Sequence, residues 1–485
     1  MAKAIMLQGT MSNVGKSFLT AALCRIFMQD GYRCAPFKSQ NMALNSFITK
    51  DGLEMGRAQA MQAEAAGTEP SVLMNPILLK PTTDVGSQVI LNGRVQGNMK
   101  ASEYFRNKKQ FLPVIQKAYE TLAQDYEIIV IEGAGSPVEL NLKTDDIVNM
   151  GIAKLMNAPV LMIGDIDRGG IFAQLLGTLM LLDPDELNLV KGLIVNQFRG
   201  DKNLFQDGVT ILEEKSRKSV LGVVPYLQCD IEDEDSLSHK LNGNQQAGLI
   251  DIAVIALPKL SNFTDFDVFS QYNGVSVRYV RKCTELKQPD LIFLPGTKNT
   301  ISDMKWLRES GMETAILKLN QTPIFGICGG YQMMGEEISD PVQAEGGGHI
   351  RGMRLLPCRT VFCESKKQTQ TKGKFLEING YFSCLSGMEF SGYEIHMGET
   401  VHHGNALTTA GGCYAGNAAG CYIHGIFDET AERLVKELYR RKNLPFSGRV
   451  ISRQEYKQQQ FDLLAENVRN CLDMSKIYQI LKEGV

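Results

Sequence analysis

The stretch Gly9-Thr-Met-Ser-Asn-Val-Gly-Lys-Ser17 decides the fold of the first half of the chain. It stands between an apolar run at residues 4–7, which predicts a strand, and a helical pattern over residues 17–28. A glycine-rich turn in this setting gathers backbone N–H groups and a helix N-terminus around an anion. In the common pattern a glycine stands where this chain has Thr10. In this chain the glycine, Gly9, stands one place earlier. We interpret the stretch as a variant phosphate loop of the type GTxSxxGKS.

The residues of this loop and of two later strand ends predict a nucleotide site. Lys16 can reach the β- and γ-phosphates of ATP, and the Ser17 hydroxyl can ligate Mg²⁺. Glu132 follows the apolar run 127–131, at the edge of a parallel sheet where a carboxylate can hold phosphate-bound Mg²⁺. Asn196 can both donate to and accept from an adenine edge. The predicted nucleotide-binding residues are Thr10, Asn13, Gly15, Lys16, Ser17 and Asn196, and the predicted metal ligands are Ser17 and Glu132.

The pattern of strands and helices predicts two α/β domains. Further buried strands are expected at 159–163, 192–195 and 221–224, and a new series begins after the polar run 242–248, at 252–257, 290–294 and 323–327. Strands that alternate with helices indicate a parallel sheet covered on both faces. We expect a ligand-binding domain at 1–240, a linker at 241–249, a second α/β domain at 250–440 and a helical tail at 441–485.

Composition excludes several classes of protein. The chain has 485 residues, of which 44% are hydrophobic and 22% charged, as in an ordinary soluble protein. Its net charge of −3 argues against a nucleic-acid partner that is bound through a basic surface. No apolar run approaches the roughly 20 residues that cross a bilayer. The 11 cysteines include no CxxC pair and no signal peptide precedes them, so we expect a reducing cytoplasm and no membrane.

A second motif, Phe325-Gly-Ile-Cys-Gly-Gly-Tyr-Gln332, predicts a cysteine nucleophile. Cys328 follows a buried strand and precedes a helix, and its glycine neighbours permit the tight turn that exposes a nucleophile. A general base is then required, and His424 is the candidate, with His396 as its competitor. The backbone N–H of Gly329, together with that of Gly296 or Thr297, is the predicted oxyanion hole.

A phosphate loop and a Cys–His pair in one chain predict ATP-driven amide formation with nitrogen from glutamine. The chain resembles the CobB/CobQ family of glutamine-dependent amidotransferases of cobalamin biosynthesis, most closely its cobyric acid synthase branch. Long matching stretches include APFKSQNMALNS (35–46), MNPILLKPTTDVGSQVILNG (74–93), GDIDRGGIFA (164–173) and GICGGYQMMG (326–335). The resemblance implies a dethiobiotin-synthetase-like ATPase domain, followed by a class I glutamine amidotransferase domain.

The resemblance also implies a reaction. The substrate would be adenosylcobyrinic acid a,c-diamide, a corrinoid whose b, d, e and g carboxylates are amidated through acyl phosphates with ATP, Mg²⁺ and glutamine. Two alternatives stay open: the sister synthase that amidates the a and c carboxylates, and a partitioning-type ATPase switch. Such a switch needs no thiol nucleophile, so Cys328 and His424 oppose the second alternative. Nothing in the sequence indicates an oligomeric state.

Site residues are carried over from the family only where its motifs match. Cys328 would be the glutaminase nucleophile and His424 its base. The family usually has Glu two residues after the histidine, where this chain has Ile426, and Glu394 or a backbone carbonyl is the expected replacement. Asp146 resembles a residue tied to the ligase step. The expected substrate-binding residues are Lys38, Gln40, Asn41, Asp165 and Arg168.

Overall fold

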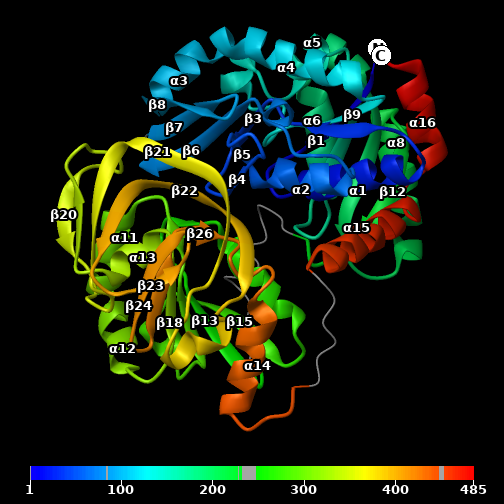
Figure 1. The fold of residues 1–485 in the computed structure, drawn as a ribbon. Coiled ribbons are helices and arrows are strands. Elements are labelled where there is room, and N and C mark those ends of the chain that lie inside the picture. The colour runs from blue at the N-terminus through cyan, green and yellow to red at the C-terminus, as the bar shows by residue number, and fades with distance from the viewer. Residues whose placement is uncertain (1, 84–85, 228, 232–246, 447–452) are drawn as a thin grey trace. The chain divides into compact units, whose positions relative to one another are not determined.

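The computed structural model describes residues 2–83, 86–227, 229–231, 247–446 and 453–485 (Figure 1). The chain divides into two compact units. The first unit comprises Met1–Ala43, Glu54–Glu234 and Tyr456–Val485, and the second comprises Leu44–Leu53 and Asp235–Glu455.

The first unit is built on a six-stranded parallel sheet with the order β12-β11-β10-β1-β9-β2. β9 and β10 are buried at every residue, and their sequences are apolar up to the polar residues at their C-terminal ends, as in parallel strands covered on both faces. β1 pairs with β9 so that Leu7 lies opposite Glu132, which brings Glu132 level with the start of the phosphate loop. The strands are β1 (Lys3–Gly9), β2 (Cys34–Phe37), β9 (Ile128–Glu132), β10 (Val160–Asp165), β11 (Val190–Phe198) and β12 (Val220–Pro225).

Helices and a smaller sheet complete the first unit. The smaller sheet has the order β3-β6-β7-β8 and consists of β3 (Gln40–Met42), β6 (Ile77–Thr83), β7 (Gly86–Leu91) and β8 (Arg94–Lys100). A short strand, β5, spans Glu54–Gly56. The helices are α1 (Lys16–Gln29), α2 (Arg57–Ala65), α3 (Ala101–Asn107), α4 (Leu112–Asp125), α5 (Met150–Leu155), α6 (Ile171–Leu181), α7 (Pro184–Leu189), α8 (Gln206–Ser216), α15 (Arg453–Arg469) and α16 (Met474–Glu483).

The second unit contains a seven-stranded sheet with the order β15-β13-β16-β18-β25-β24-β23. Its strands from β15 to β25 are parallel to their neighbours, and β24 and β23 add an antiparallel edge. Ile327 lies opposite Cys421, so the two strands end at the same edge. The strands are β13 (Ile250–Ile255), β15 (Val275–Val280), β16 (Leu291–Leu294), β18 (Ile324–Ile327), β23 (Asn405–Thr408), β24 (Gly411–Ala415) and β25 (Ala418–Cys421).

A five-stranded sheet with the order β20-β19-β21-β22-β26 also belongs to the second unit. It consists of β19 (Glu337–Asp340), β20 (Gly348–Arg351), β21 (Cys358–Lys374), β22 (Glu389–His402) and β26 (Ile423–His424). Three short strands are β4 (Ser46–Ile48), β14 (Leu260–Ser261) and β17 (Gly296–Thr297). The helices are α10 (Cys283–Leu286), α11 (Thr300–Glu309), α12 (Met312–Lys318), α13 (Gly329–Met334), α14 (Ala431–Arg441) and the 3₁₀ segment η5 (Phe263–Gln271).

The predicted fold class is confirmed, but the predicted domain limits differ from the units. The expected linker 241–249 lies largely outside the described residues. The expected tail is divided: α14 ends in the second unit, whereas α15 and α16 lie in the first. Phe461, Leu464 and Val468 of α15 join the apolar core that surrounds α1, because they form one buried stripe of that helix.

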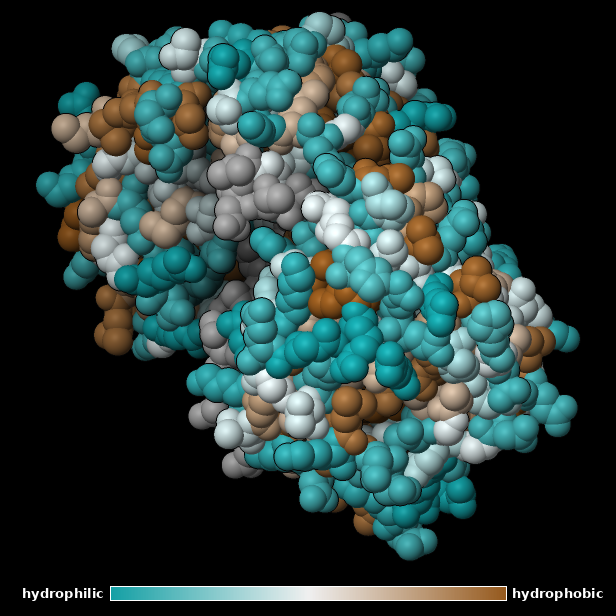
Figure 2. Space-filling model, turned by 90° about the vertical axis from the view of Figure 1, so that its left-hand side faces the viewer, coloured by the Kyte–Doolittle hydropathy of each residue, from teal (hydrophilic) through white to brown (hydrophobic). Residues whose placement is uncertain are grey.

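On the face drawn in Figure 2, hydrophilic residues predominate and hydrophobic ones form small separate groups. Among the helices of the described ranges, none combines the length and the apolar character that a membrane span requires.

Candidate active sites

Cys328 lies in the sharp turn that its sequence predicts. It follows β18 directly, precedes α13, and has a φ of 52° and a ψ of −110°. Non-glycine residues rarely adopt a positive φ, and such strained residues gather at functional sites. A Cβ atom on Gly330 would lie 1.9 Å from the carbonyl oxygen of Leu294, so glycine is required where α13 crosses the neighbouring strand. The turn therefore depends on close backbone packing beneath it.

His424 is the base that the structure places beside Cys328. The two side chains form a hydrogen bond, and His424 is 1% exposed. The Nδ1 atom of His424 donates to the Oδ2 atom of Asp265 at 2.7 Å, and the backbone N–H of Gly425 donates to Oδ1 at 3.0 Å. Cys328, His424 and Asp265 thus form a hydrogen-bonded line of nucleophile, base and carboxylate.

The Asp265 carboxylate determines the charge of His424. Burial by itself lowers the pKa of His424, but the charge of Asp265 and its hydrogen bond raise this pKa more, to about 10. The imidazole is therefore protonated at neutral pH. A protonated imidazole beside a thiol favours the thiolate, which is the nucleophilic form.

Backbone groups of the predicted oxyanion hole surround this line. A Cβ atom on Gly296 would lie 3.2 Å from the Cε1 atom of His424. A Cβ atom on Gly329 would lie 3.0 Å from the backbone nitrogen of Thr297. The structure thus gathers Gly296, Thr297 and Gly329 next to the nucleophile and its base.

The expectation that Glu394 orients His424 is wrong. The Oε2 atom of Glu394 lies 3.1 Å from the Nε2 atom of His396 and 2.8 Å from the Nζ atom of Lys367. Burial by itself raises the pKa of Glu394, but these two neighbours lower this pKa by more, to about 2. The ring of His396 stacks on Tyr422 at 3.7 Å between centroids. Glu394 and His396 belong to a separate cluster, and Asp265 occupies the position that sequence reasoning assigned to Glu394.

The phosphate loop of the first unit is held by its own Lys16 and by a side chain from β11. Gly15 has a φ of 86°, a conformation that favours glycine, and it begins α1. The Nδ2 atom of Asn196 donates to the carbonyl oxygen of Val14 at 2.8 Å. The Nζ atom of Lys16 donates to the carbonyl oxygens of Met11 at 2.9 Å and of Gly135 at 3.2 Å. Asn196 therefore supports the loop, and its use in reading adenine stays a prediction.

The two other loop residues predicted for the nucleotide also have defined places. The Oγ1 atom of Thr10 donates to Gln174 at 3.2 Å. Asn13 has a φ of 63°, and its carbonyl oxygen accepts from the side chain of Gln197 at 3.0 Å. Thr10, Asn13 and Gly15 thus lie in the turn between β1 and α1, and Lys16 and Ser17 are the first two residues of α1.

The two predicted metal ligands lie together. The Oγ atom of Ser17 donates to the Oε1 atom of Glu132 at 2.8 Å. Lys38 also donates to Oε1 at 2.8 Å, and Gln62 donates to Oε2 at 2.6 Å. Burial raises the pKa of Glu132, but Lys38 and these hydrogen bonds lower it more, so the carboxylate stays charged.

This oxygen-rich cluster fits a hard cation such as Mg²⁺. Within the described parts of the chain, the Oε1 atom of Gln62 is buried without a hydrogen-bond partner, which leaves an oxygen in the cluster to be satisfied. In the same parts, no group of three or more His, Cys, Asp or Glu side chains has an arrangement that could hold a metal ion. The candidate Mg²⁺ site therefore depends on Ser17, Glu132 and the phosphates of a nucleotide.

The carboxylate of Asp146 holds the backbone turn that leads into α5. Its Oδ1 atom accepts from the backbone N–H groups of Val148 and Asn149 at 2.8 and 2.9 Å, and its Oδ2 atom accepts from Gly151 at 2.8 Å. Three such bonds to the backbone ahead of and within α5 are enough to explain why an aspartate stands at this position, even if it takes no part in the reaction. The catalytic role of Asp146 stays a prediction.

The predicted substrate-binding residues fall into two groups. Lys38 and Asn41 are buried, in contact with Glu132 and Gln59 respectively, whereas Gln40 accepts from the hydroxyl of Tyr104 at 2.6 Å. Asp165 and Arg168 form an ion pair at 3.2 Å, in which the arginine side chain is 55% exposed. Arg168 is therefore the more accessible cation for an anionic substrate.

Comparison with known proteins agrees with this two-site arrangement. The CobQ/CobB/MinD/ParA nucleotide binding domain matches residues 5–238, and the CobB/CobQ-like glutamine amidotransferase domain matches residues 251–432. A cobyric acid synthase of Lachnoclostridium phytofermentans is 54% identical over 100% of both chains. The chain belongs to the cobyric acid synthase family. Cobyric acid synthases of Ruminiclostridium cellulolyticum (53% identical; 100% of this chain, 98% of the relative) and Alkaliphilus metalliredigens (48%; 98% and 99%) are also similar.

As a member of the cobyric acid synthase family, the chain is a glutamine-dependent amidating ligase of cobalamin biosynthesis. Its eleven cysteines are all free, so Cys328 is available as a thiol. Asp265 is the residue that the sequence motifs of the family did not reveal. A signal existed in the stretch Phe263-Thr-Asp-Phe-Asp-Val-Phe269, because carboxylates within an apolar run need a buried partner.

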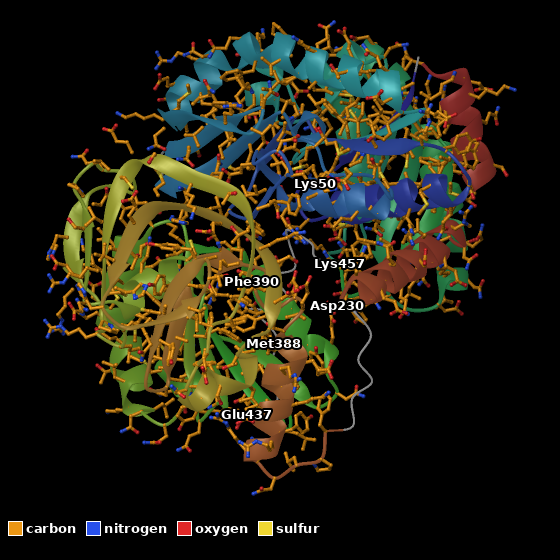
Figure 3. All side chains as sticks on the ribbon, in the orientation of Figure 1. Lys50, Asp230, Met388, Phe390, Glu437 and Lys457 are labelled. Atoms are coloured by element: carbon orange, nitrogen blue, oxygen red, sulfur yellow. The ribbon has the colours of Figure 1, made fainter. Side chains whose placement is uncertain are left out.

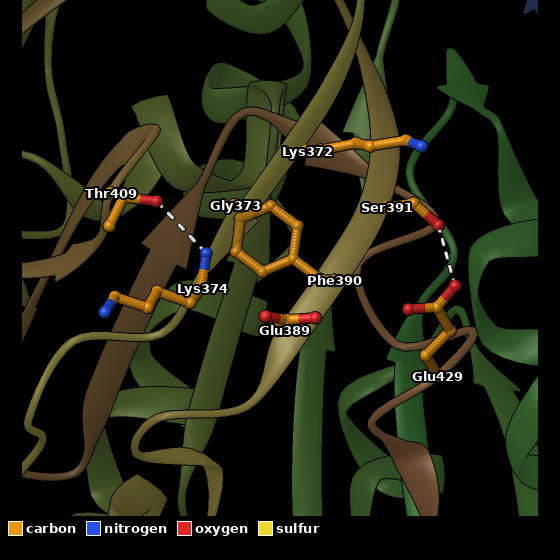
Figure 4. A pocket seen from close by; sticks show the side chains of 8 residues that line it. All are labelled: Lys372, Gly373, Lys374, Glu389, Phe390, Ser391, Thr409 and Glu429. Atoms are coloured by element: carbon orange, nitrogen blue, oxygen red, sulfur yellow. Dashed lines mark hydrogen bonds between the residues drawn. The ribbon is translucent and has the colours of Figure 1, made fainter.

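One cavity of this cobyric acid synthase family member is lined by residues other than those of the two sites. It has a volume of about 590 Å³ and lies where β21 and β22 come together (Figure 4). Its lining residues are Lys372, Gly373, Lys374, Glu389, Phe390, Ser391, Thr409 and Glu429. None of them is a predicted site residue, and neither Cys328 nor His424 reaches it, so we assign the cavity no part in the reaction.

Proposed function

We propose that this protein amidates the b, d, e and g side-chain carboxylates of adenosylcobyrinic acid a,c-diamide, with ATP and glutamine, to give adenosylcobyric acid. The observation that carries the proposal is the hydrogen-bonded line Cys328–His424–Asp265 in a chain that also has the phosphate loop ending in Lys16-Ser17. Each half supplies one requirement of the reaction: ammonia from a stable amide, and an activated carboxylate.

The ammonia half follows from the geometry of the thiol. The Cys328 thiolate attacks the side-chain carbonyl carbon of glutamine, and the Gly329 N–H with that of Gly296 or Thr297 stabilises the resulting oxyanion. Protonated His424 gives its proton to the departing nitrogen, which leaves as ammonia. Water then cleaves the glutamyl thioester, with His424 as the base, so that glutamate leaves and the thiol is restored.

The ligase half requires that a carboxylate be made reactive toward ammonia. We propose that a substrate carboxylate oxygen attacks the γ-phosphorus of ATP, so that the bond to the β-phosphate breaks, ADP leaves and an acyl phosphate forms. Lys16 neutralises charge on the γ-phosphate during this transfer. Ser17 and Glu132 would hold Mg²⁺, which supplies charge neutralisation at the phosphates. Arg168 is the accessible cation for the substrate carboxylates. Ammonia replaces the phosphate to form the amide.

The decisive experiment is mass spectrometry of the corrinoid product. The purified protein is incubated with ATP, Mg²⁺, glutamine and adenosylcobyrinic acid a,c-diamide, and each amidation replaces a hydroxyl by an amino group. Four successive replacements are expected. A parallel incubation uses cobyrinic acid as the substrate. If only cobyrinic acid is amidated, and only at two carboxylates, the protein is the a,c-diamide synthase instead. If neither substrate is amidated, the proposal is overturned.

The division of labour is tested with Cys328→Ala. This variant should lose synthesis with glutamine and keep synthesis with ammonium salts, because only the thiol step is removed. Loss of both activities in a folded variant would contradict a separate glutaminase site. Cys363→Ala is a matched control, because Cys363 lies on β21 and its thiol donates to the carbonyl oxygen of Met397.

A further inference from the structure

A segment from the N-terminal half of the sequence belongs to the second unit. Leu44–Leu53 lies between β3 and β5 along the chain, yet it is part of the unit that contains Cys328 and His424. Lys50, labelled in Figure 3, marks its position, and β4 forms its centre. We call Leu44–Leu53 the inserted segment.

The inserted segment makes a reciprocal contact with the start of η5. The backbone N–H of Asn262 donates to the Oδ1 atom of Asn45 at 2.6 Å, and the backbone N–H of Ser46 donates to the Oδ1 atom of Asn262 at 3.3 Å. Asn45 and Asn262 are both buried. Asn262 has a φ of 52°, and its carbonyl oxygen accepts from the N–H of Asp265 at 3.2 Å. The contact thus fixes the turn that carries the carboxylate partner of His424.

A second contact joins the inserted segment to His424 through Tyr393. The hydroxyl of Tyr393 donates to the carbonyl oxygen of Ser46 at 3.2 Å and accepts from the Nδ2 atom of Asn262 at 3.2 Å. The Tyr393 ring stacks on His424, with 5.2 Å between centroids and 22° between planes. The same tyrosine therefore touches both the inserted segment and the base.

A third contact reaches the strand beside the nucleophile. Ile48 is fully buried and forms a small apolar cluster with Tyr393 and Ile395. The carbonyl oxygen of Ile395 lies 3.7 Å from the sulfur of Cys328. The side chain of Gln370 donates to the carbonyl oxygen of Ile48, which ties the segment to β21 as well. All three members of the hydrogen-bonded line thus have a neighbour held by the inserted segment.

We propose that Asn45 and Ile48 are positioning residues of the glutaminase, supplied by the N-terminal half of the sequence. The proposal rests on the proposed function, because it takes Cys328 and His424 as the glutaminase pair. Asn45 holds the η5 turn so that Asp265 meets His424, and Ile48 holds β22 so that Tyr393 and Ile395 meet His424 and Cys328. Neither residue touches glutamine or exchanges a proton.

The polar contacts of Asn45 and Ser46 lead to the residues around His424. They go to Asn262, three residues before Asp265, and to Tyr393, which stacks on His424. The ends of the segment are fixed in the first unit: the N–H of Ala43 donates to Leu79, and Glu54 forms a buried ion pair with Lys80 at 2.8 Å. The chain itself therefore connects the smaller sheet of the first unit to the glutaminase residues.

The test compares Asn45→Leu, Asn45→Asp and Ile48→Val in the full-length protein. Leucine matches asparagine in size but cannot accept the Asn262 N–H, whereas aspartate keeps the accepting oxygen. Asn45→Leu should lower kcat for glutamine hydrolysis about 10- to 100-fold, with KM for glutamine changed little, because misplaced catalytic groups slow the chemistry. Asn45→Asp should recover most of the loss, and Ile48→Val should show a smaller decrease. Asp51→Asn, an exposed position on the same segment, is the control.

Two further measurements separate positioning from folding. The ammonia-dependent synthesis rate and the melting temperature of each variant should stay close to those of the unaltered protein. The rate at which iodoacetamide alkylates Cys328, followed by mass spectrometry of its peptide across pH, should change in Asn45→Leu and not in Asp51→Asn. The alkylation rate can be measured without glutamine turnover. If Asn45→Leu does not fold, the same measurements are made on Ile48→Val.

The outcomes are distinct for this proposal and for the proposed function. If Cys328→Ala keeps glutamine-dependent synthesis, the proposed function is wrong. If Cys328→Ala loses that synthesis while Asn45→Leu and Ile48→Val keep full glutamine hydrolysis, the positioning role is overturned and the function stands. A parallel loss of ammonia-dependent synthesis would also overturn it, since the segment would then matter to the whole protein.

Discussion

The Nδ1 atom of His424 lies 2.7 Å from the Oδ2 atom of Asp265, which is 159 residues earlier in the chain. Both side chains are buried, and the Gly425 N–H fixes the second carboxylate oxygen. The pair gives the glutaminase candidate an orienting carboxylate that comes from η5 and not from the segment after the histidine. Two predictions depend on it.

We predict that Asp265→Asn lowers kcat for glutamine hydrolysis by about 10²- to 10⁴-fold. The amide cannot stabilise a protonated imidazole and can turn its NH₂ group toward Nδ1, which favours the wrong tautomer. Steady-state kinetics with glutamine and with ammonium salts would check this, and the ammonia rate should be retained. Glu394→Gln is the matched control from the neighbouring cluster. A larger loss in Glu394→Gln than in Asp265→Asn would reverse the assignment.

The same pair predicts a pH dependence of stability. Asp265 raises the pKa of His424 to about 10 in the folded protein, above its ordinary value of 6.5. A raised pKa means that the stabilisation is complete below pH 6.5 and is lost as the pH rises through about 10. The melting temperature of the unaltered protein should exceed that of Asp265→Asn most at pH 6 to 6.5, and the gap should narrow toward pH 10. A gap that widens over this interval would show that the pair is not ionised.

In the first unit, we predict that Lys16→Met lowers ATP-dependent synthesis on the order of 10²-fold with either nitrogen source, because the γ-phosphate loses its cation. Release of ADP with glutamine and with ammonium salts would measure the effect. Glutamine hydrolysis should remain detectable in the variant. Unchanged synthesis with ammonium salts would refute the role of the loop.

A buried ion pair predicts a large effect on stability alone. Arg278 binds Asp251 through two bonds of 2.7 Å, and both side chains are 7% exposed. Asp251→Asn should reduce the free energy of unfolding of the second unit by about 3 kcal/mol, because it leaves a buried guanidinium without its counter-charge. Urea titration followed by near-ultraviolet circular dichroism would measure it. The exposed pair Arg359–Glu336 provides the control, since Glu336→Gln should hardly change the midpoint.

Local patterns were sufficient to predict the framework and the two motifs. The run 127–131 became β9 at Ile128–Glu132, and the helical pattern at 17–28 became α1 at Lys16–Gln29. The turn at Cys328 could be predicted because glycines stand on both sides of the cysteine, and a tight turn is one of the few structures that require glycine at such positions. His424 could be preferred over His396 only because of the family motif; the structure supports that choice through the contact with Cys328.

Partners that are distant in sequence could not be predicted. Asp265 lies outside any motif, and its role depends on how η5 folds against β26. The apolar stripe of α15 indicates a helix with one buried face, but the stripe does not say which core it joins. Asn45 lies in the matching stretch 35–46, where no pattern indicates its partner, and only its contact with Asn262 shows that it belongs to the second unit.

The chain passes between its two units four times, at 43/44, 53/54, 234/235 and 455/456. No single cut can therefore divide it into two self-contained polypeptides. A gene split near residue 240 would yield a C-terminal fragment without Leu44–Leu53 and an N-terminal fragment without α15 and α16. Fission of the gene, or exchange of either half, would therefore separate segments that belong to one folded unit.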